Sequence, residues 1–419
     1  MLTKAPRGTS DLYGNEMLRW QELENTVRGL CRDFSYQEIR TPMFEHTELF
    51  SRSVGETTDV VQKEMYTFLD KGFRSISLKP EGTAGVVRAY LERNMYADIQ
   101  PTKLFYITPA FRYEKPQAGR LRQFHQFGVE LFGSDHPSAD AEIIALGVQM
   151  LERLNIKNVE LNINSLGGPE CRKKYNEILK GFIDDNIETL CPTCKERAVK
   201  NPLRVLDCRE TTCKEVLKVA PPIIEYLDIE CKTHFEQLQE LLDAMNIKYT
   251  VNPWVVRGLD YYTKTVFEFI SKEIGSQGTI CGGGRYNGLI EECGGSPTPA
   301  VGFGAGIERL LLTITASNGN NEIKTSVDLY IGTMGFKANV KAAELVQALR
   351  RANIKAEIDL LGRSVKAQMK YANKINAKYS LIIGDNELSE NQAMLKNMDT
   401  GEQIKVVLDS LVEEMAKLV

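Results

Sequence analysis

The sequence predicts an α+β fold: an antiparallel sheet with flanking helices, a mainly helical insertion, and a C-terminal α/β domain. Two segments rich in aromatic and β-branched residues, 104–115 and 121–133, enclose a short polar loop and predict an antiparallel hairpin. Helical, charged sequence with proline breaks runs from about 168 to 250. Strand-like and helix-like segments alternate from 326 onward, which is typical of a small α/β domain.

A helix followed by a strand opens the chain. The helix is predicted over 18–31 because apolar residues recur there at helical spacing. The following YQEIRTP alternates like a strand and ends at Pro42. The predicted hairpin comes next, so we expect residues 1–167 to form the first part of one α+β domain.

The insertion, 168–250, is followed by strand-like, Gly-rich sequence, and we expect 251–325 to complete the interrupted domain. Polar, unpatterned sequence at 315–326 is the best linker candidate. The last domain is expected over 326–419. Its first five elements should alternate as β-α-β-α-β, over 327–334, 339–352, 354–360, 364–375 and 379–385.

Composition is that of a globular protein, with 42% hydrophobic and 26% charged residues in 419. A net charge of −4 gives no global positive field, so any nucleic-acid surface must be local. We expect no membrane association, because no apolar run approaches the roughly 20 residues that span a bilayer and the start lacks the apolar stretch of a signal peptide. Nine cysteines without an export signal fit a reducing compartment, so the expected location is cytoplasmic.

Three short elements could carry chemistry. The first is Pro42, which alone is only a strand terminator. The second is FRYE, in which Arg112 and Glu114 would project from one strand face because they are two residues apart. The third is GFGAGIERLLLTI, 302–314, whose alternate glycines leave one strand face bare for a flat group such as a purine, while Arg309 in the first helical turn would face phosphate. It is neither a dinucleotide fingerprint nor a P-loop.

In this order the three elements resemble motifs 1, 2 and 3 of the class II aminoacyl-tRNA synthetases. RGLDYYTKTVFEF (257–269) and CGGGRYNGL (281–289) resemble the two signature peptides of the histidyl-tRNA synthetase family, the second with departures at Cys281, Gly282 and Asn287. LKPEGTAGVVR and RQFHQFGVELFG extend the resemblance over nearly the whole chain. It implies a class II catalytic sheet with flanking helices and a C-terminal anticodon-binding domain.

The resemblance also implies the activity. Members activate L-histidine with ATP and Mg²⁺, without an organic cofactor, and transfer it to tRNA(His), giving AMP and pyrophosphate. Since a carboxylate must approach a phosphate, the site needs guanidinium groups, which donate forked hydrogen bonds to both. By resemblance Arg112 binds the α-phosphate and the histidine carboxylate, Arg257 binds the α-phosphate from the opposite side, and Arg309 lies near the γ-phosphate.

Further roles follow from the same resemblance. Glu114 is expected to face the adenine, Phe124 to stack on it, and Gly304 to line the ATP site; a structural ion pair and a core aromatic are the alternatives for the first two. The expected histidine-binding residues are Glu81, Gly82, Thr83 and Gln126 near the ammonium group, and Glu130, Tyr261 and Tyr262 near the imidazole.

Contacts with RNA are expected in two places. Lys366, Lys370 and Lys374 recur every fourth residue and would form a stripe on one helix face, as backbone RNA contacts require. A solvated lysine face is the alternative. Gln117 and Arg120, at the hairpin tip, would meet the acceptor end of tRNA. A homodimer is expected, because motif 1 forms the subunit interface in this class.

Two alternatives stay open at this point. Cys191, Cys194, Cys208 and Cys213 form C-x₂-C-x₁₃-C-x₄-C, a spacing that suggests structural Zn²⁺, yet the family does not generally depend on zinc and buried free thiols are common. No metal ligand is therefore assigned. The alternative function is a catalytically silent, histidine-binding regulator of ATP phosphoribosyltransferase, although such paralogues tend to lose the motif residues.

Overall fold

The computed structural model describes residues 3–419 except 56–57, 59, 209, 276–277, 320–321 and 324. The chain divides into two compact units, 1–321 and 322–419. Within the described part of the chain, no helix is both long and apolar enough to cross a membrane.

A large sheet organises the first unit and has eight strands among the described residues. Its neighbours are antiparallel except for the parallel pairs at its two ends, which confirms the predicted antiparallel sheet. In spatial order the strands are β1 (Gln37–Glu38), β5 (Thr102–Phe111), β6 (Gln123–Phe132), β11 (Ala300–Gly306), β10 (Thr279–Arg285), β9 (Thr263–Ser271), β7 (Val159–Ser165) and β8 (Thr250–Val251). A smaller sheet contains β2 (Phe44–His46), β4 (Ser75–Leu78) and β3 (Thr67–Leu69).

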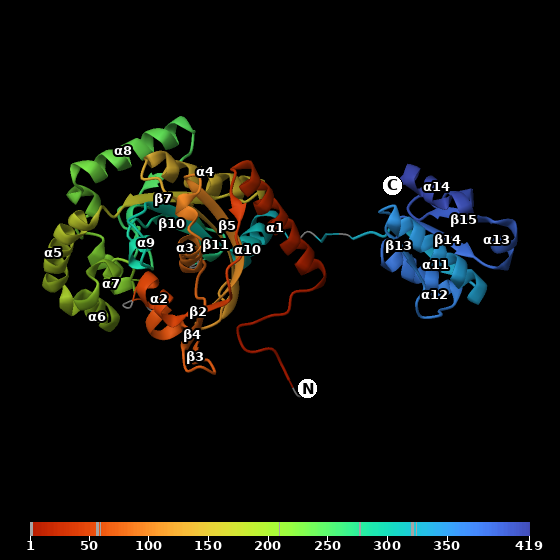
Figure 1. The fold of residues 1–419 in the computed structure, drawn as a ribbon, viewed down its shortest axis with the longest axis horizontal. Coiled ribbons are helices and arrows are strands. Elements are labelled where there is room, and N and C mark those ends of the chain that lie inside the picture. The colour runs from red at the N-terminus through yellow and green to blue at the C-terminus, as the bar shows by residue number, and fades with distance from the viewer. Residues whose placement is uncertain are drawn as a thin grey trace. The chain divides into compact units, whose positions relative to one another are not determined.

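Helices cover the large sheet and bury its core (Figure 1). The helices outside the insertion are α1 (Gly14–Asp33), α2 (Thr47–Val54), α3 (Thr83–Glu92), α4 (Pro137–Arg153), α9 (Leu289–Glu292) and α10 (Ile307–Asn318). The predicted helix at 18–31 is confirmed as part of α1, whose Trp20, Leu23 and Val27 are buried. They join one cluster with the odd-numbered β6 residues Phe127 and Val129, so the even-numbered residues of β6 face the opposite side of the sheet.

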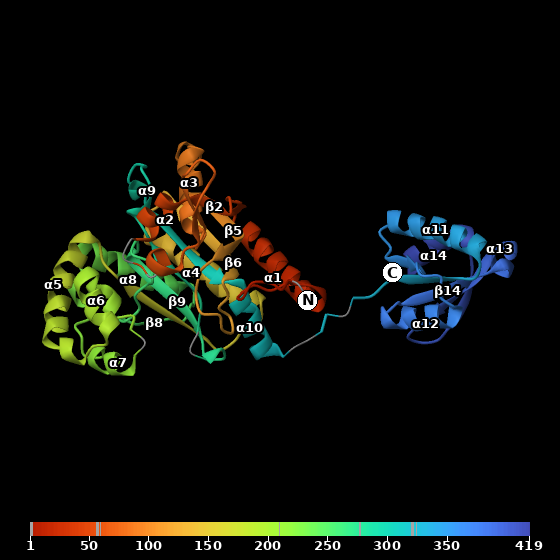
Figure 2. The same cartoon turned by 90° about the horizontal axis from the view of Figure 1, so that it is seen from below.

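The segment 168–250 is mainly helical, as predicted. It contains α5 (Pro169–Asp185), α6 (Pro192–Lys200), α7 (Thr211–Leu217) and α8 (Ile229–Ala244), with 3₁₀ turns at Ile187–Thr189, Pro202–Val205 and Ile223–Tyr226. Helices α5, α6 and α7 gather beside the end of the sheet that holds β7 and β8, as Figure 1 and Figure 2 both show. The segment belongs to the same compact unit as the sheet.

The second unit has a five-stranded sheet among its described residues. The predicted β-α-β-α-β order is confirmed, with β12, β13 and β14 mutually parallel and β12 in the middle. Two antiparallel strands and two helices follow. The elements are β12 (Leu329–Thr333), α11 (Phe336–Arg351), β13 (Ala356–Ile358), α12 (Val365–Lys374), β14 (Tyr379–Ile383), α13 (Asp385–Glu390), β15 (Gln392–Asn397), β16 (Gln403–Val407) and α14 (Leu411–Leu418).

The linker prediction for 315–326 is wrong at its start. Thr315 to Asn318 form the last turn of α10, where the Thr315 hydroxyl donates to the carbonyl of Leu311 at 2.8 Å. Because the side chains of that turn are mostly polar, the apolar periodicity that indicates a helix is missing there. Residues 320–321 and 324 of the predicted linker lie outside the described residues.

A buried ion pair ties the sheet to the helices that cover it. Arg285 of β10 is fully buried and donates from Nε and Nη2 to Oδ2 of Asp140 in α4, at 3.0 and 2.6 Å. His234 of α8 lies 3.2 Å from the same oxygen. Burial opposes ionisation of Asp140, but the charges of Arg285 and His234 outweigh it and lower the pKa of the carboxyl.

Replacing Asp140 with asparagine should lower the free energy of unfolding by about 3–5 kcal/mol near neutral pH, because Arg285 keeps its buried charge without a counterion. The loss should shrink as the pH falls below about 4, the ordinary aspartate value, because the unfolded parent then gains a proton that the folded carboxyl, with its lowered pKa, still resists. Urea unfolding at several pH values measures both effects. The matched control is Asp33→Asn, whose ion pair with Arg153 is exposed and should cost less than about 1 kcal/mol. Equal losses in the two variants would contradict the assignment.

Candidate active site

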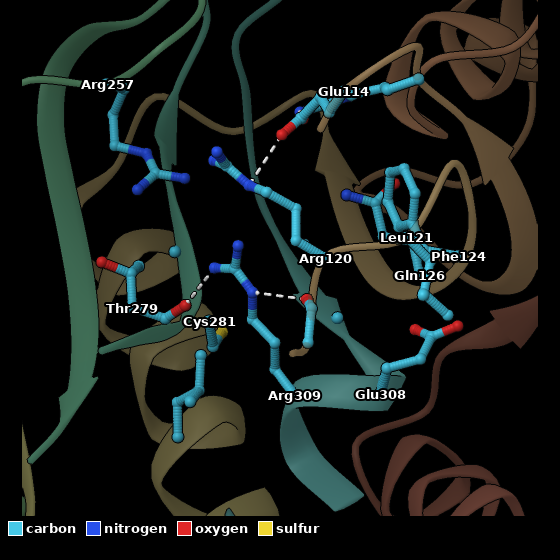
Figure 3. A pocket seen from close by; sticks show the side chains of 16 residues that line it. Glu114, Arg120, Leu121, Phe124, Gln126, Arg257, Thr279, Cys281, Glu308 and Arg309 are labelled. Atoms are coloured by element: carbon cyan, nitrogen blue, oxygen red, sulfur yellow. Dashed lines mark hydrogen bonds and ion pairs between the residues drawn. The ribbon is translucent and has the colours of Figure 1, made fainter. Parts of the chain in front are cut away.

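A cavity of about 190 Å³ opens on the face of the sheet that carries the even-numbered residues of β6. The β5–β6 loop, β6, β10, β11 and the start of α10 form its walls, and Figure 3 shows Arg120, Arg257 and Arg309 reaching into it from different sides. The lining residues are Arg112, Glu114, Gly119, Arg120, Leu121, Phe124, Gln126, Arg257, Thr279, Ile280, Cys281, Gly282, Gly304, Gly306, Glu308 and Arg309.

The glycines of β11 serve a different purpose from the predicted one at two of their three positions. A Cβ on Gly302 would lie 2.0 Å from Oε2 of Glu130, and one on Gly304 would lie 2.3 Å from Nε2 of Gln126. These neighbours come from β6, which pairs with β11. The bare strand face therefore first makes room for Glu130 and Gln126; Gly304 and Gly306 still line the cavity.

Replacing Gly302 with alanine should lower the free energy of unfolding by about 1–3 kcal/mol, as overpacking does. The new methyl group would also lie 2.4 Å from the backbone oxygen of Val129, so a rotamer change in Glu130 alone cannot relieve it. Gly181→Ala is the control, because nothing beyond its chain neighbours and the backbone of α5 lies within 4 Å of its Cβ position. That substitution should stabilise the helix by up to about 1 kcal/mol. Similar unfolding midpoints for the two variants in urea would contradict the assignment.

Arg112 lies at the cavity for a different reason from the predicted one. Strand β5 ends at Phe111, and the amide of Glu114 donates to the carbonyl of Arg112 at 2.8 Å, so the alternation of a strand does not apply. The prediction of one strand face is wrong there, yet the two side chains are neighbours, with Nη1 and Oε1 4.0 Å apart. Nε of Arg112 donates to the carbonyl of Pro80 at 2.8 Å, and its guanidinium lies 5.5 Å from the ring centre of Phe124.

Arg257 and Arg309 hold fixed positions on the other side of the cavity. Nη1 of Arg257 is ion-paired with Glu268 of β9. Burial opposes the charge of Arg257, but the Glu268 carboxylate outweighs it and raises the pKa of the guanidinium above its ordinary value. Arg309 donates from Nη1 to the carbonyl of Thr279 at 2.7 Å and from Nε to that of Gly119 at 3.2 Å (Figure 3). Both side chains are charged and oriented by protein contacts.

The two RNA contacts predicted in the β5–β6 loop lie in different surroundings. Gln117 is exposed in the loop, as expected. Arg120 points inward and lines the cavity, where its Nε lies 2.7 Å from Oε2 of Glu114 (Figure 3). Glu114 therefore takes part in an ion pair, the structural role that the sequence left as its alternative. Phe124 lines the cavity rather than the core.

A group of polar side chains lies deeper in the protein, next to the cavity. Glu81 is 2% exposed and accepts from the amides of Thr83 and Ala84 at 2.7 and 2.8 Å. Glu130 is 1% exposed and accepts from the Thr83 hydroxyl at 2.8 Å. Gln126, which also lines the cavity, accepts from the amide of Gly82 at 2.9 Å. We call this group the inner polar cluster; its members are Glu81, Gly82, Thr83, Tyr106, Gln126, Glu130 and Tyr286.

Burial controls the charge of the inner polar cluster. It raises the pKa of Glu130 to about 8, although hydrogen bonds from the hydroxyls of Tyr286 and Thr83 oppose the shift. Burial also raises the pKa of Glu81, against the opposing effect of the amides of Ala84 and Thr83. Two acidic groups that burial disfavours as anions are suited to receive a cationic or N–H-donating ligand.

Aromatic hydroxyl groups complete the surroundings of Glu130. Tyr261 and Tyr262 are buried with ring centres 4.6 Å apart, and the guanidinium of Arg257 lies 5.8 Å from the ring centre of Tyr262. Tyr262 thus lies beside a residue that lines the cavity, and Tyr261 lies beside Tyr286 of the inner polar cluster, with ring centres 5.5 Å apart.

Sequence reasoning missed three residues of the site. The hydroxyl of Tyr106 lies 3.2 Å from Oε1 of Glu130, and Tyr286 donates to Oε2 of the same carboxylate. Glu308, in the first turn of α10, accepts the amide of His125 with both oxygens, at 2.9 and 3.0 Å, and so fixes β6 between Phe124 and Gln126. Gly82 and Gly128 were the sequence signal that could have indicated Tyr106. A Cβ at either glycine would lie less than 2.5 Å from the Tyr106 ring.

The second unit carries the predicted lysine stripe. Lys366, Lys370 and Lys374 lie on α12 and are exposed, while Gln368 and Ala372 of the same helix are buried. The three side chains are one helical turn apart, so the expected basic face is present.

Comparison with known proteins agrees with this geometry. The family model described as "Histidyl-tRNA synthetase" matches residues 8–168 and 185–310, and the one described as "Anticodon binding domain" matches 328–418. The chain is 56% identical over 416 residues to a histidine–tRNA ligase of Clostridioides difficile, covering 99% of both chains. It is 54% identical over 418 residues to that of a Thermoanaerobacter species, covering 100% of both. The solved structure of apo S. aureus histidyl-tRNA synthetase is similar with a TM-score of 0.85 and 42% identity, over 99% of this chain and 100% of that one.

Proposed function

Because this chain belongs to the histidyl-tRNA synthetase family, we propose that the cavity and the inner polar cluster together form its catalytic centre. The chain is a histidine–tRNA ligase, an ATP-dependent enzyme whose substrates are histidine, ATP and tRNA(His). The observation that carries the proposal is that Arg112, Arg257 and Arg309 converge on one cavity beside two buried carboxyl groups. Full-length identity to ligases leaves the regulatory alternative without support.

Activation is a problem of charge. The histidine carboxylate attacks the α-phosphorus of ATP, a C–O–P linkage forms, and the bond to pyrophosphate breaks. We assign Arg112 and Arg257 to the α-phosphate from opposite sides and Arg309 to the region of the γ-phosphate. Fixed guanidinium groups stabilise the negative charge that builds on the phosphoryl oxygens, and they need no reorientation during the reaction. No general base is required, because the nucleophile is already an anion.

Mg²⁺ is proposed to enter with ATP, bound mainly by phosphate oxygens. The donor set supports this. Of the two carboxylates that line the cavity, Glu114 pairs with Arg120 and Glu308 accepts the amide of His125. Arg257, already charged by its pairing with Glu268, supplies a positive charge at the α-phosphate without a protein-bound metal.

Histidine recognition is assigned to the inner polar cluster and the paired tyrosines. Glu81, with Gly82, Thr83 and Gln126, provides anionic and polar partners for the α-ammonium group. Glu130, Tyr261 and Tyr262 provide acceptors and donors for the two imidazole nitrogens. Because these groups are buried, a side chain without ring nitrogens would leave them unpaired, which gives strong discrimination.

Adenine is assigned to the wall made by Glu114, Phe124 and Gly304, where the ring of Phe124 offers a stacking surface. Gln117 and Arg120 of the hairpin loop are proposed to meet the acceptor end of tRNA. The ion pair between Arg120 and Glu114 would then have to open, so tRNA and adenine binding are coupled through this loop.

The domain assignment is 1–167 and 251–325 for the catalytic domain, 168–250 for the insertion and 326–419 for the anticodon-binding domain. The division of the chain at 321–322 and the family match over 328–418 support the last boundary. A homodimer through motif 1 is also proposed. Large apolar side chains are exposed on and beside the small sheet that follows Pro42: Met43, Phe44, Phe68, Leu69 and Phe73. The cytoplasm is the proposed location, since all nine cysteines are free thiols.

Exchange of labelled pyrophosphate into ATP tests the function without tRNA. We expect exchange with histidine and none with a panel of other amino acids, including phenylalanine and glutamine. Exchange that is independent of the amino acid would contradict the assignment of the inner polar cluster to histidine.

Replacing Lys366, Lys370 and Lys374 together with glutamine should raise the KM for tRNA(His) by about tenfold or more and leave pyrophosphate exchange unchanged. If each lysine contacts one phosphate, the negative slope of log affinity against log salt concentration should become less steep by about 2 to 3. The control is the triple glutamine variant of Lys396, Lys405 and Lys417, exposed lysines on other elements of the same unit. Equal losses in the two triple variants would show that the three lysines form only a solvated helix face and do not bind tRNA specifically.

A further inference from the structure

Four cysteine thiols of the insertion meet at one point. The Sγ atoms of Cys191, Cys194, Cys208 and Cys213 all lie within 4.8 Å of one another. Cys191 and Cys208 are 3.8 Å apart, sulfur to sulfur. Zinc–sulfur bonds of about 2.3 Å in a tetrahedron give sulfur–sulfur distances of about 3.8 Å. The four thiols thus have close to the spacing that a tetrahedral ion requires.

The backbone around the thiols is arranged to present them. Cys191 precedes α6 and Cys194 lies in its first turn, with the amide of Cys194 donating to the carbonyl of Cys191 at 2.9 Å. The amide of Cys191 donates to Sγ of Cys213 at 3.2 Å. Backbone N–H groups that point at sulfur are the outer-shell contacts that orient thiolate ligands.

From this geometry we propose that Cys191, Cys194, Cys208 and Cys213 bind one structural Zn²⁺ ion. Binding replaces four S–H bonds with four Zn–S bonds and releases four protons, with no change of oxidation state. The resulting site carries two net negative charges. The segment 191–218 that surrounds it contains seven lysines and arginines against four acidic residues, which suits that charge.

A purely apolar role for the thiols explains less. Cys194 and Cys213 are fully buried, as core residues would be. However, the local elements are short: α6 has 9 residues, α7 has 7, and the 3₁₀ turn between them has 4. Helices of this length are marginal by themselves, so a bound ion would add a constraint to the hydrophobic cluster in which the thiols lie.

The zinc site would also support the active-site loop that carries Arg257. Between the second and third thiols, Asn201 donates to Oδ1 of Asp260 at 2.9 Å. Arg204 lies 3.5 Å from the same oxygen and donates to the carbonyl of Gly258. The ion would therefore position the Arg257 loop without taking part in the chemistry.

A second thiol group provides a control. Cys171, Asp228 and Cys231 are also close together. There the Asp228 carboxylate already accepts from the amide of Cys231 at 2.8 Å and from the Cys171 thiol at 3.0 Å. The Asp228 carboxylate is therefore already engaged as the N-cap of α8, and the Cys231 thiol accepts from the amide of Gly168 at 3.2 Å, so this group is not assigned a metal.

The test measures zinc in the untagged full chain, purified under reducing conditions, supplied with Zn²⁺ and freed of excess by gel filtration. We expect about one zinc per chain in the parent and in Cys171→Ser, and at least a tenfold lower content in Cys194→Ser and in Cys213→Ser. Co²⁺ in place of zinc should give the visible absorption of a tetrahedral tetrathiolate in the parent. Zinc retained in both Cys194→Ser and Cys213→Ser would overturn the proposal.

The parent chain alone decides the matter if those variants do not fold. Titration with a mercurial reagent should release one zinc ion as four thiols react. These thiols should react more slowly in the zinc-bound protein than in the zinc-free protein. A parent that keeps no zinc after gel filtration would overturn the proposal. A disulfide between Cys191 and Cys208 in the reduced, zinc-supplied protein would overturn it as well.

Discussion

Replacing Arg257 with alanine should lower histidine-dependent pyrophosphate exchange by about 10³-fold, with most of the loss in kcat. The guanidinium is held beside the cavity by Glu268, and this counterion keeps it charged at any working pH despite its burial. Its proposed contact with the α-phosphate becomes stronger as negative charge builds there, so substrate binding should change less than the rate. Initial rates of exchange at varied ATP and histidine separate the two effects.

Loss of Arg257 also leaves the Glu268 carboxylate without its counterion, and this could lower activity through misfolding. The double variant Arg257→Met, Glu268→Gln is the control, because it removes both charges and keeps the volume. It should unfold at a urea concentration close to that of the parent and remain as inactive as Arg257→Ala. Exchange within tenfold of the parent in a folded double variant would refute the role of Arg257.

Replacing Glu130 with glutamine should lower kcat/KM for histidine by about 100-fold and yet stabilise the fold above neutral pH. The loss follows because a buried carboxyl that can ionise to accept an imidazole N–H is replaced by an amide that stays neutral. The glutamine keeps the volume and one oxygen, which can serve the hydroxyls of Thr83 and Tyr106 at the Oε1 position. Its N–H₂ group then meets the Tyr286 hydroxyl, whose oxygen can accept. Exchange assays at varied histidine measure the first effect.

The stability effect has a defined sign. The pKa of Glu130 is about 8 in the folded chain against 4.5 as its ordinary value, so the folded state holds a proton that the unfolded chain releases. Parent stability should therefore fall as the pH rises from about 4.5 to 8, at up to about 1.4 kcal/mol per pH unit, and Glu130→Gln should lack this part of the decline. Urea unfolding of both proteins at about pH 6 and pH 8.5 tests this. A decline of the same size in the variant would contradict the assigned ionisation.

Local patterns were sufficient to predict the parts of the fold that depend on nearby residues. Helical periodicity predicted α1, and the two aromatic segments predicted the β5–β6 hairpin, because each signal lies within one element. The alternate glycines predicted a strand that runs into a helix, which is β11 followed by α10. These features need no information about distant neighbours.

Contacts between distant segments were beyond the sequence alone. The reason for Gly302 is Glu130 on a neighbouring strand, which becomes visible only when the register of β6 and β11 is known. Glu308 fixes His125 from 183 residues away. Arg112 lies past the end of β5, where the backbone turns, so its direction could not be derived from alternation. The resemblance to a family supplied Arg112 as a candidate, and the geometry supplied the physical reason for each of these positions.

The most direct test of the account is a crystal structure of the full chain with a non-hydrolysable analogue of histidyl-adenylate. The account predicts the phosphate-mimicking group between Arg112 and Arg257, the imidazole against Glu130 and Tyr262, and the adenine on Phe124. An analogue bound with its imidazole away from Glu130, or with its phosphate-mimicking group beyond hydrogen-bond reach of Arg257, would contradict it.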